Sequence, residues 1–235
     1  MTENHPPSSR DEPEDLSQRA HRRVIGLLGL FLPVLLYLLA GIRPTDGLPR
    51  WDLLNSVSAY YYTGGVGVFV GVLFALSLFL FTYRGYKGVK ADRIVGALGC
   101  AAALVVALFP TSAPGCLRAP AWWCKTTGVV HYVAAVVLFV AFIVFSLWLF
   151  RKSNIPNKRN RPRGKRYRDG LCLACGLIMI VCVLWAASSS ITAAPIFLPE
   201  AIAIVAFAVS WLVKGEAHQP VINLAKRLMR GIAGR

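Results

Sequence analysis

Acidic residues, histidines and recognisable catalytic motifs are scarce in this sequence. The 235 residues include 11 Asp and Glu against 26 Lys and Arg, and only four His. There is no glycine-rich phosphate loop, metal-ligand motif or nucleophile elbow, which excludes the usual signatures of nucleotide-binding proteins, zinc enzymes and α/β-hydrolases. Of the four histidines only His131 lies in an apolar segment, and one histidine is too few for a catalytic zinc. We therefore expect no metal and no cofactor.

Long apolar segments are what the chain has in abundance, since apolar residues make up 56% of it. Six segments have about the 20-residue length that an α-helix needs to cross a bilayer core of ~30 Å. They lie near residues 23–42, 64–83, 93–111, 127–150, 170–188 and 195–213. The sequence therefore predicts an all-α polytopic membrane protein with six transmembrane helices.

Basic residues are distributed unequally between the two sides of these segments. All but four of the 26 Lys and Arg residues fall on one side, the exceptions being Arg43, Arg50, Arg118 and Lys125. By the positive-inside rule, we expect both termini in the cytoplasm. We expect the protein itself in the inner membrane of the cell. The same distribution explains the net charge of +15, so we expect contact with anionic lipid headgroups at the cytoplasmic face and no nucleic-acid partner.

The polar ends of the chain differ from the central part. Residues 1–22 are rich in Pro, Ser and charged residues and have little to bury, which predicts a disordered cytoplasmic arm. Residues 23–213 form the predicted six-helix domain. In residues 214–235, apolar residues recur at helical spacing among basic ones, which predicts an amphipathic helix on the cytoplasmic membrane surface.

Cysteines and glycines suggest how the chain is held together. Cys116 and Cys124 lie in a connection predicted to be outside the cell, where an oxidising compartment permits a disulfide between them. Cys172 and Cys175 share one helical face within a predicted span, and Gly67 and Gly71 form a small-x-x-x-small pair. Residues of this size let helices approach closely, so helix packing is their expected role.

Ionisable residues within the spans are the strongest functional signal, because each is costly unless it is paired or hydrated. Only His131 and Glu200 qualify, and both fall near the outer ends of their predicted helices. We interpret them as an acid–base pair. The structural alternatives are that Glu200 is stabilised by the positive end of its helix and that His131 binds a neighbouring carbonyl group.

The connection between the first two spans is the most polar stretch at the same depth. If it is helical, its spacing places Asp52, Asn55, Ser56 and Thr63 on one stripe over a membrane cavity. We expect these four residues to bind the polar part of a substrate, together with three neighbours. The neighbours are Arg43, Tyr60 and Tyr61. The alternatives are a helix cap for Asp52 and an interfacial aromatic belt for the tyrosines.

Several short motifs resemble a family of small bacterial multi-pass membrane proteins of unknown function. They are residues 56–65, Val68-Phe69-Val70-Gly71, Ala107-Leu108-Phe109-Pro110-Thr111 and His131-Tyr132. The resemblance extends over about residues 25–213 and implies a six-helix integral membrane protein, with no activity to carry over.

Three functions are compatible with these features. The first is binding or modification of a lipid or other amphiphile in a polar pocket at the outer leaflet. The second is a non-catalytic assembly or stabilising subunit of a cell-envelope complex, with a membrane protein as its partner. The third is a small proton-coupled transporter that uses Glu200 and His131 as its titrating pair.

Overall fold

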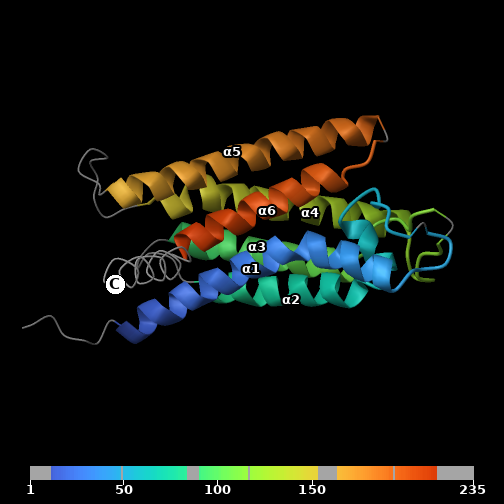
Figure 1. The fold of residues 1–235 in the computed structure, drawn as a ribbon, viewed down its shortest axis with the longest axis horizontal. Helices are drawn as coiled ribbons and strands as arrows, with labels where there is room; N and C mark the ends of the chain where they lie inside the picture. The colour runs from blue at the N-terminus through green and yellow to red at the C-terminus, as the bar shows by residue number, and fades with distance from the viewer. Residues whose placement is uncertain are drawn as a thin grey trace, which may run out of the picture.

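The protein is an elongated bundle of helices, and no strand occurs among the residues that its computed structural model describes, which are 12–48, 50–83, 90–115, 117–152, 163–192 and 194–215. The α-helices are α1 (Glu12–Ile42), α2 (Val66–Thr82), α3 (Lys90–Leu108), α4 (Lys125–Leu147), α5 (Arg163–Ile191) and α6 (Phe197–Lys214). There are two short 3-10 helices: η1 (Ser58–Tyr62) precedes α2, and η2 (Leu149–Arg151) follows α4. The α-helices run alongside one another down the long axis (Figure 1). The all-α prediction is confirmed.

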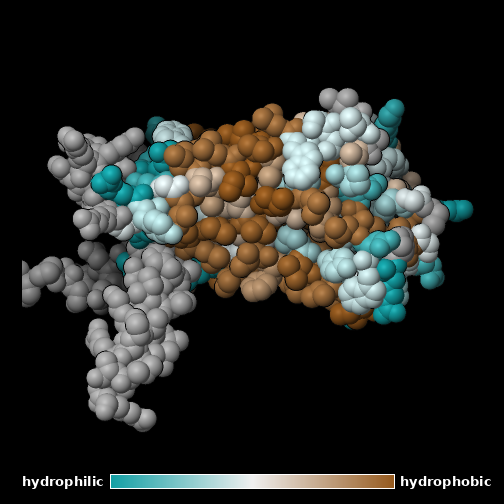
Figure 2. Space-filling model, turned by 45° about the horizontal axis from the view of Figure 1, so that its top comes forward, coloured by the Kyte–Doolittle hydropathy of each residue, from teal (hydrophilic) through white to brown (hydrophobic). Residues whose placement is uncertain are grey.

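The surface of the bundle is that of a membrane protein. Within the described residues, five helices are long and apolar enough to cross a bilayer, and the sixth, α2, is apolar but has only 17 residues. Figure 2 shows a hydrophobic belt around the middle of the visible face, with hydrophilic residues toward the ends. Large apolar side chains of the helices are exposed, such as Leu78 and Val181 at 63% each. A multi-pass membrane protein is therefore confirmed.

The first helix begins earlier than the sequence predicted. α1 starts at Glu12, so residues 12–22 are helical where a disordered arm was expected. Extending an existing helix costs much less free energy than nucleating a new one. A contact with α2 also holds the first part of α1 in place. His21 Nε2 donates a hydrogen bond to the carbonyl oxygen of Phe79 in α2 (2.8 Å). Residues 1–11 and the predicted amphipathic segment after Gly215 lie outside the described residues.

α6 lies between α1 and α5 and carries the centre of the core (Figure 1). Phe207 of α6 stacks on Phe142 of α4 with ring centroids 3.6 Å apart. One turn further on, Trp211 is fully buried and meets Tyr83 and Phe145 edge-on or tilted. Aromatic contacts of this kind rigidify one half of the bundle.

Close helix contact is made by a glycine other than the predicted pair. A Cβ on Gly96 of α3 would lie 2.7 Å from the carbonyl oxygen of Leu80, so only glycine permits this approach of α2 and α3. Gly67 and Gly71 have nothing within 4 Å of such a Cβ. Their predicted role in packing within the bundle is therefore wrong. Cys172 and Cys175 are buried, as the packing interpretation predicted.

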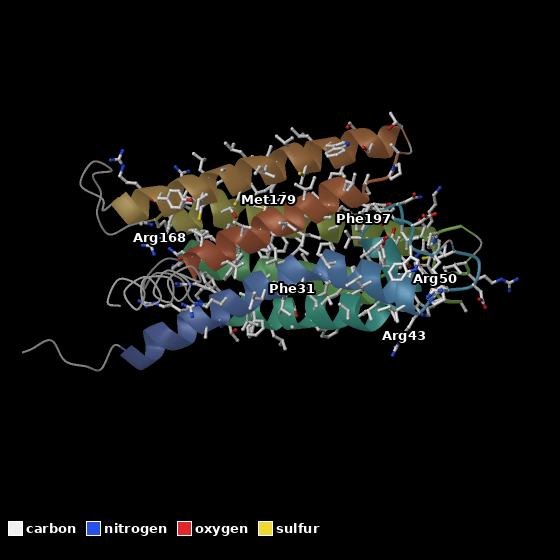
Figure 3. All side chains as sticks on the ribbon, viewed as in Figure 1. Phe31, Arg43, Arg50, Arg168, Met179 and Phe197 are labelled. Atoms are coloured by element: carbon white, nitrogen blue, oxygen red, sulfur yellow. The ribbon has the colours of Figure 1, made fainter. Side chains whose placement is uncertain are left out.

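The basic residues sort to the two ends of the bundle. Figure 3 shows Arg43 and Arg50 at one end and Arg168 at the other. At the first end, Arg50 Nε donates to the carbonyl oxygen of Gly41 (2.9 Å), which satisfies one of the unpaired carbonyl groups at the end of α1. The backbone of Trp51 has a positive φ of 64°, and the ring of Trp51 lies against Gly41. The connection that follows α1 is thereby folded back onto the helix.

Candidate functional site

The connection between α1 and α2 does not form the single helix that a continuous polar stripe requires. Only Ser58–Tyr62 is helical, as the 3-10 helix η1, and residues 52–57 form a loop. Asp52 and Asn55 are exposed on this loop, whereas Thr63 is buried beneath it. The predicted stripe is therefore absent, because a turn of 3-10 helix and an extended loop present side chains with a different period from an α-helix.

Glu200 ties this loop to α6. It lies in the first turn of α6, where a negative charge interacts favourably with the helix dipole. Its Oε2 accepts a hydrogen bond from the backbone N–H of Val57 (2.7 Å). The Ile196 N–H donates to the Asn55 carbonyl oxygen (2.6 Å), which makes a second bond between the same two segments. Among the described residues, the Val57 bond is the only hydrogen bond to the Glu200 carboxyl group, which leaves Oε1 available to a ligand.

His131 ties the next residue of the loop to α4. Its Nδ1–H donates to the carbonyl oxygen of Phe109, at the end of α3 (2.6 Å). That bond places the proton of the neutral ring on Nδ1, so Nε2 accepts from the Ser58 hydroxyl (3.0 Å). His131 is only 2% exposed. The ring is thus fixed between a carbonyl group and a serine.

Glu200 and His131 are therefore neighbours of one loop rather than partners of each other. They bind consecutive residues, Val57 and Ser58, and no hydrogen bond joins them directly among the described residues. The predicted acid–base pair stays a prediction. Ser58 was not among the residues expected in the site. No local spacing could reveal it, because 73 residues separate it from His131.

Two of the predicted substrate-binding residues stabilise the turn instead. Ser56 Oγ accepts the N–H of Ala59 (3.0 Å), as a serine commonly does at the start of a helical turn. Thr63 Oγ1 donates to the Tyr60 carbonyl oxygen (2.8 Å) and accepts the Gly65 N–H (3.1 Å). Because these oxygens are already engaged, they serve the local fold.

The tyrosines of η1 face the protein. Tyr60 is fully buried and its ring lies 5.6 Å from that of Phe197 in α6. Burial raises the pKa of the Tyr60 hydroxyl. Tyr61 is partly buried and meets Phe69 of α2 edge-on. Among the predicted binding residues, this leaves Arg43, Asp52 and Asn55 exposed at the end of the bundle.

An apolar cavity lies beneath the loop, between α1, α2, α3, α4 and α6. Its empty volume is about 630 Å³, counting the part open to the outside. Leucine, valine, alanine and phenylalanine side chains form most of its wall, among them Leu32, Leu138 and Phe207. Its polar side chains are those of Ser58 and Glu200. The cavity is thus an apolar chamber with the loop and its two anchoring contacts at one end.

The predicted disulfide is not supported. Cys116 lies outside the described residues, and Cys124 is an exposed free cysteine. Hydrogen bonding to Thr127, whose Oγ1 lies 3.4 Å from the sulfur, lowers the pKa of the Cys124 thiol. No group of three or more His, Cys, Asp or Glu side chains suited to a metal occurs in the part of the chain that the structure describes.

Substitution of Glu200 separates its hydrogen bond from its charge. Glu200→Leu leaves the buried Val57 N–H without its acceptor, so we expect the free energy of unfolding to fall by about 1–3 kcal/mol. Glu200→Gln retains an acceptor oxygen and should stay within about 1 kcal/mol of the wild type. Thermal unfolding of the purified protein in detergent measures both. Equal destabilisation by the two variants would contradict the anchoring role.

Comparison with known families gives one match. The model of a family described as "protein of unknown function (DUF998)" matches residues 52–215, more than half of the chain. The matched region contains Ser58, His131 and Glu200, but α1 lies before it. Neither the curated proteins nor the solved structures include a match to this chain.

Proposed function

We propose that this chain, which belongs to the DUF998 family of proteins of unknown function, binds the apolar part of a lipid or other amphiphile in the cavity between α1, α2, α3, α4 and α6. The observation that carries the proposal is the wall of the cavity. It is almost wholly apolar but ends at two polar side chains, Ser58 and Glu200. Ligand sites commonly combine an apolar wall with a few polar groups that orient the ligand.

The polar end of the cavity determines which amphiphile is favoured. A lipid tail gains little from moving out of the bilayer into an equally apolar cavity, because the bilayer core is already apolar. Selectivity must then come from the headgroup. Oε1 of Glu200 accepts hydrogen bonds, and Oε2 is already held by Val57. A headgroup with hydroxyl or ammonium donors fits this end better than an anionic one.

The orientation in the membrane follows from helix length and charge. α2 has 17 residues, or about 26 Å at 1.5 Å per residue, which is close to the ~30 Å of a bilayer core. We propose that the chain crosses the cell membrane six times with both termini in the cytoplasm, and the cavity loop is then near the outer leaflet. Arg168 then lies on the cytoplasmic side, where basic residues attract anionic lipid headgroups.

The cavity does not favour a function as a proton-coupled transporter. Apart from Ser58 and Glu200, its wall has no polar side chain that would carry a proton or an ion onward. The role as an assembly subunit stays a prediction.

Blocking the cavity tests the proposal. Ala135 of α4 lies in the wall, whereas its neighbour Val136 is 55% exposed on the outside of the bundle. We expect Ala135→Phe to reduce labelling by a photoactivatable phospholipid at least about tenfold, which is 1.4 kcal/mol in affinity. Val136→Phe should leave it unchanged. Mass spectrometry should place the label on cavity residues. Labelling that is equal in all three proteins, or confined to the outer surface, would overturn the proposal.

A further inference from the structure

We propose that Ser58 and His131 are the nucleophile and general base of an esterase site that cleaves an acyl ester held in the cavity. The inference rests on the proposed function, because the cavity must first bind the acyl chain. Ser58 is the point at which the two features meet. It is among the residues that line the cavity, and its hydroxyl is bonded to His131 Nε2.

The geometry matches what a serine nucleophile needs. The Ser58 Oγ lies 3.0 Å from His131 Nε2, within the range for proton transfer between a nucleophile and its base. The base is oriented by a third group, since its Nδ1–H donates to the Phe109 carbonyl oxygen at 2.6 Å. This bond holds the tautomer in which Nε2 is free to take a proton. A catalytic triad uses a carboxylate for the same purpose.

The surroundings of Ser58 suit the reaction. His131 is 2% exposed, so the base is shielded from its surroundings. Ser58 itself is partly exposed and is one of the residues in the cavity wall. Its backbone N–H donates no hydrogen bond to any other described residue, whereas the N–H groups of Val57 and Ala59 are both engaged. The Ser58 N–H is therefore available to the oxygen on which negative charge develops during acyl transfer.

The chemistry is that of ester hydrolysis in two steps. In the first, Ser58 Oγ attacks the carbonyl carbon of the ester, and its proton passes to His131 Nε2. The bond from the carbonyl carbon to the alcohol oxygen breaks, and the departing alcohol takes that proton. In the second, water attacks the acyl-serine with His131 again as the base. The fatty acid leaves and the Ser58 hydroxyl is restored.

The cavity determines the substrate class. The apolar wall of the cavity, with Ser58 at its polar end, suits an acyl chain whose ester group lies at the serine. The Glu200 carboxyl group lies in the same wall and can accept a hydrogen bond from a hydroxyl group of the alcohol part. The class is therefore a long-chain fatty acyl ester of a polyhydroxy alcohol, such as a glycerolipid.

The test uses a fluorophosphonate with a long alkyl chain on the full chain in detergent. Ser58 Oγ attacks phosphorus, fluoride leaves, and the serine proton passes to His131. We expect wild type to carry the adduct on Ser58, and Ser58→Ala to carry none. Ser188→Ala is the matched control, since Ser188 is exposed on α5 and its hydroxyl donates to Trp185 of the same helix, and it should react like wild type. His131→Gln should slow the reaction at least about 100-fold, which is the usual contribution of a general base.

Photoactivatable phospholipid labelling of the same proteins distinguishes the two proposals. Ser58→Ala and His131→Gln that still label in the cavity but do not react with the fluorophosphonate support the esterase site, because the fold and binding are then intact. Wild type that labels in the cavity but leaves Ser58 unmodified would overturn the esterase site and leave the proposed function standing. Reaction of His131→Gln at the wild-type rate would also overturn it. Loss of both signals in the wild type would overturn both proposals.

Discussion

Asp92→Leu is expected to lower the free energy of unfolding by about 3 kcal/mol, because it breaks a buried ion pair. Asp92 is 1% exposed in the first turn of α3, and its carboxylate lies 3.6 Å from the Nζ of Lys152, just after η2. Removing one member of a buried ion pair removes a charge that stabilises the other. The value is taken at the low end of the usual range because the Lys152 side chain is 20% exposed.

Asp169→Leu is the matched control. Asp169 pairs with Lys165 one turn earlier in the same helix (2.8 Å), so its loss breaks a contact within one helix. Pairs of this spacing contribute about 0.2–0.5 kcal/mol. Thermal or denaturant unfolding of the three proteins in one detergent provides the comparison. If Asp92→Leu is no less stable than Asp169→Leu, the Asp92 ion pair does not hold α3 to η2. The Asp92 ion pair joins two elements, whereas the Asp169 ion pair lies within α5.

Gly96→Val is expected to destabilise the protein by about 3 kcal/mol. The added Cβ would lie 2.7 Å from the carbonyl oxygen of Leu80, and a backbone atom cannot move aside as the tip of a side chain can. Relieving the clash requires α3 to separate from α2, which opens the packing between them. Overpacking of this kind costs about 1–3 kcal/mol, and a contact with backbone belongs at the upper end.

Gly67→Val introduces the same side chain into α2, where nothing lies within 4 Å of the new Cβ. Its stability should equal or exceed that of the wild type by up to about 1 kcal/mol, because glycine is a poor helix former. Unfolding in detergent, with the helical content from circular dichroism, measures both variants. A Gly67→Val protein as unstable as Gly96→Val would contradict the view that the close approach of α2 to α3 makes Gly96→Val unstable.

The positions of most membrane segments could be predicted from local sequence patterns alone. Helix α6 was expected over residues 195–213 and is observed over Phe197–Lys214, because an apolar run of spanning length with a polar residue at each end has few alternatives. The start of α1 was misplaced because the contact of His21 with Phe79 joins residues 58 positions apart. No local pattern records such a contact.

The site was only partly predictable for the same reason. His131 and Glu200 stood out by their type, since ionisable residues are rare in apolar segments. The residues that they bind did not stand out in the sequence. Ser58 looks like any other serine of a polar turn, and its significance arises only when α4 brings His131 within 3.0 Å of it. Conversely, Ser56 and Thr63 resembled ligand-binding residues, but their oxygens bond to the turn in which they lie.

The sequence by itself determined that this is an all-helical membrane protein, which segments form its apolar helices, and which two ionisable residues lie within them. Apolar length and side-chain type are local properties, and the bilayer acts on each segment separately. Only the tertiary structure decided that α2 and α3 meet at Gly96, that Glu200 and His131 bind consecutive residues of one loop, and that an apolar cavity ends at Ser58. These features depend on how the helices pack against one another, which pairs residues that are far apart in the chain.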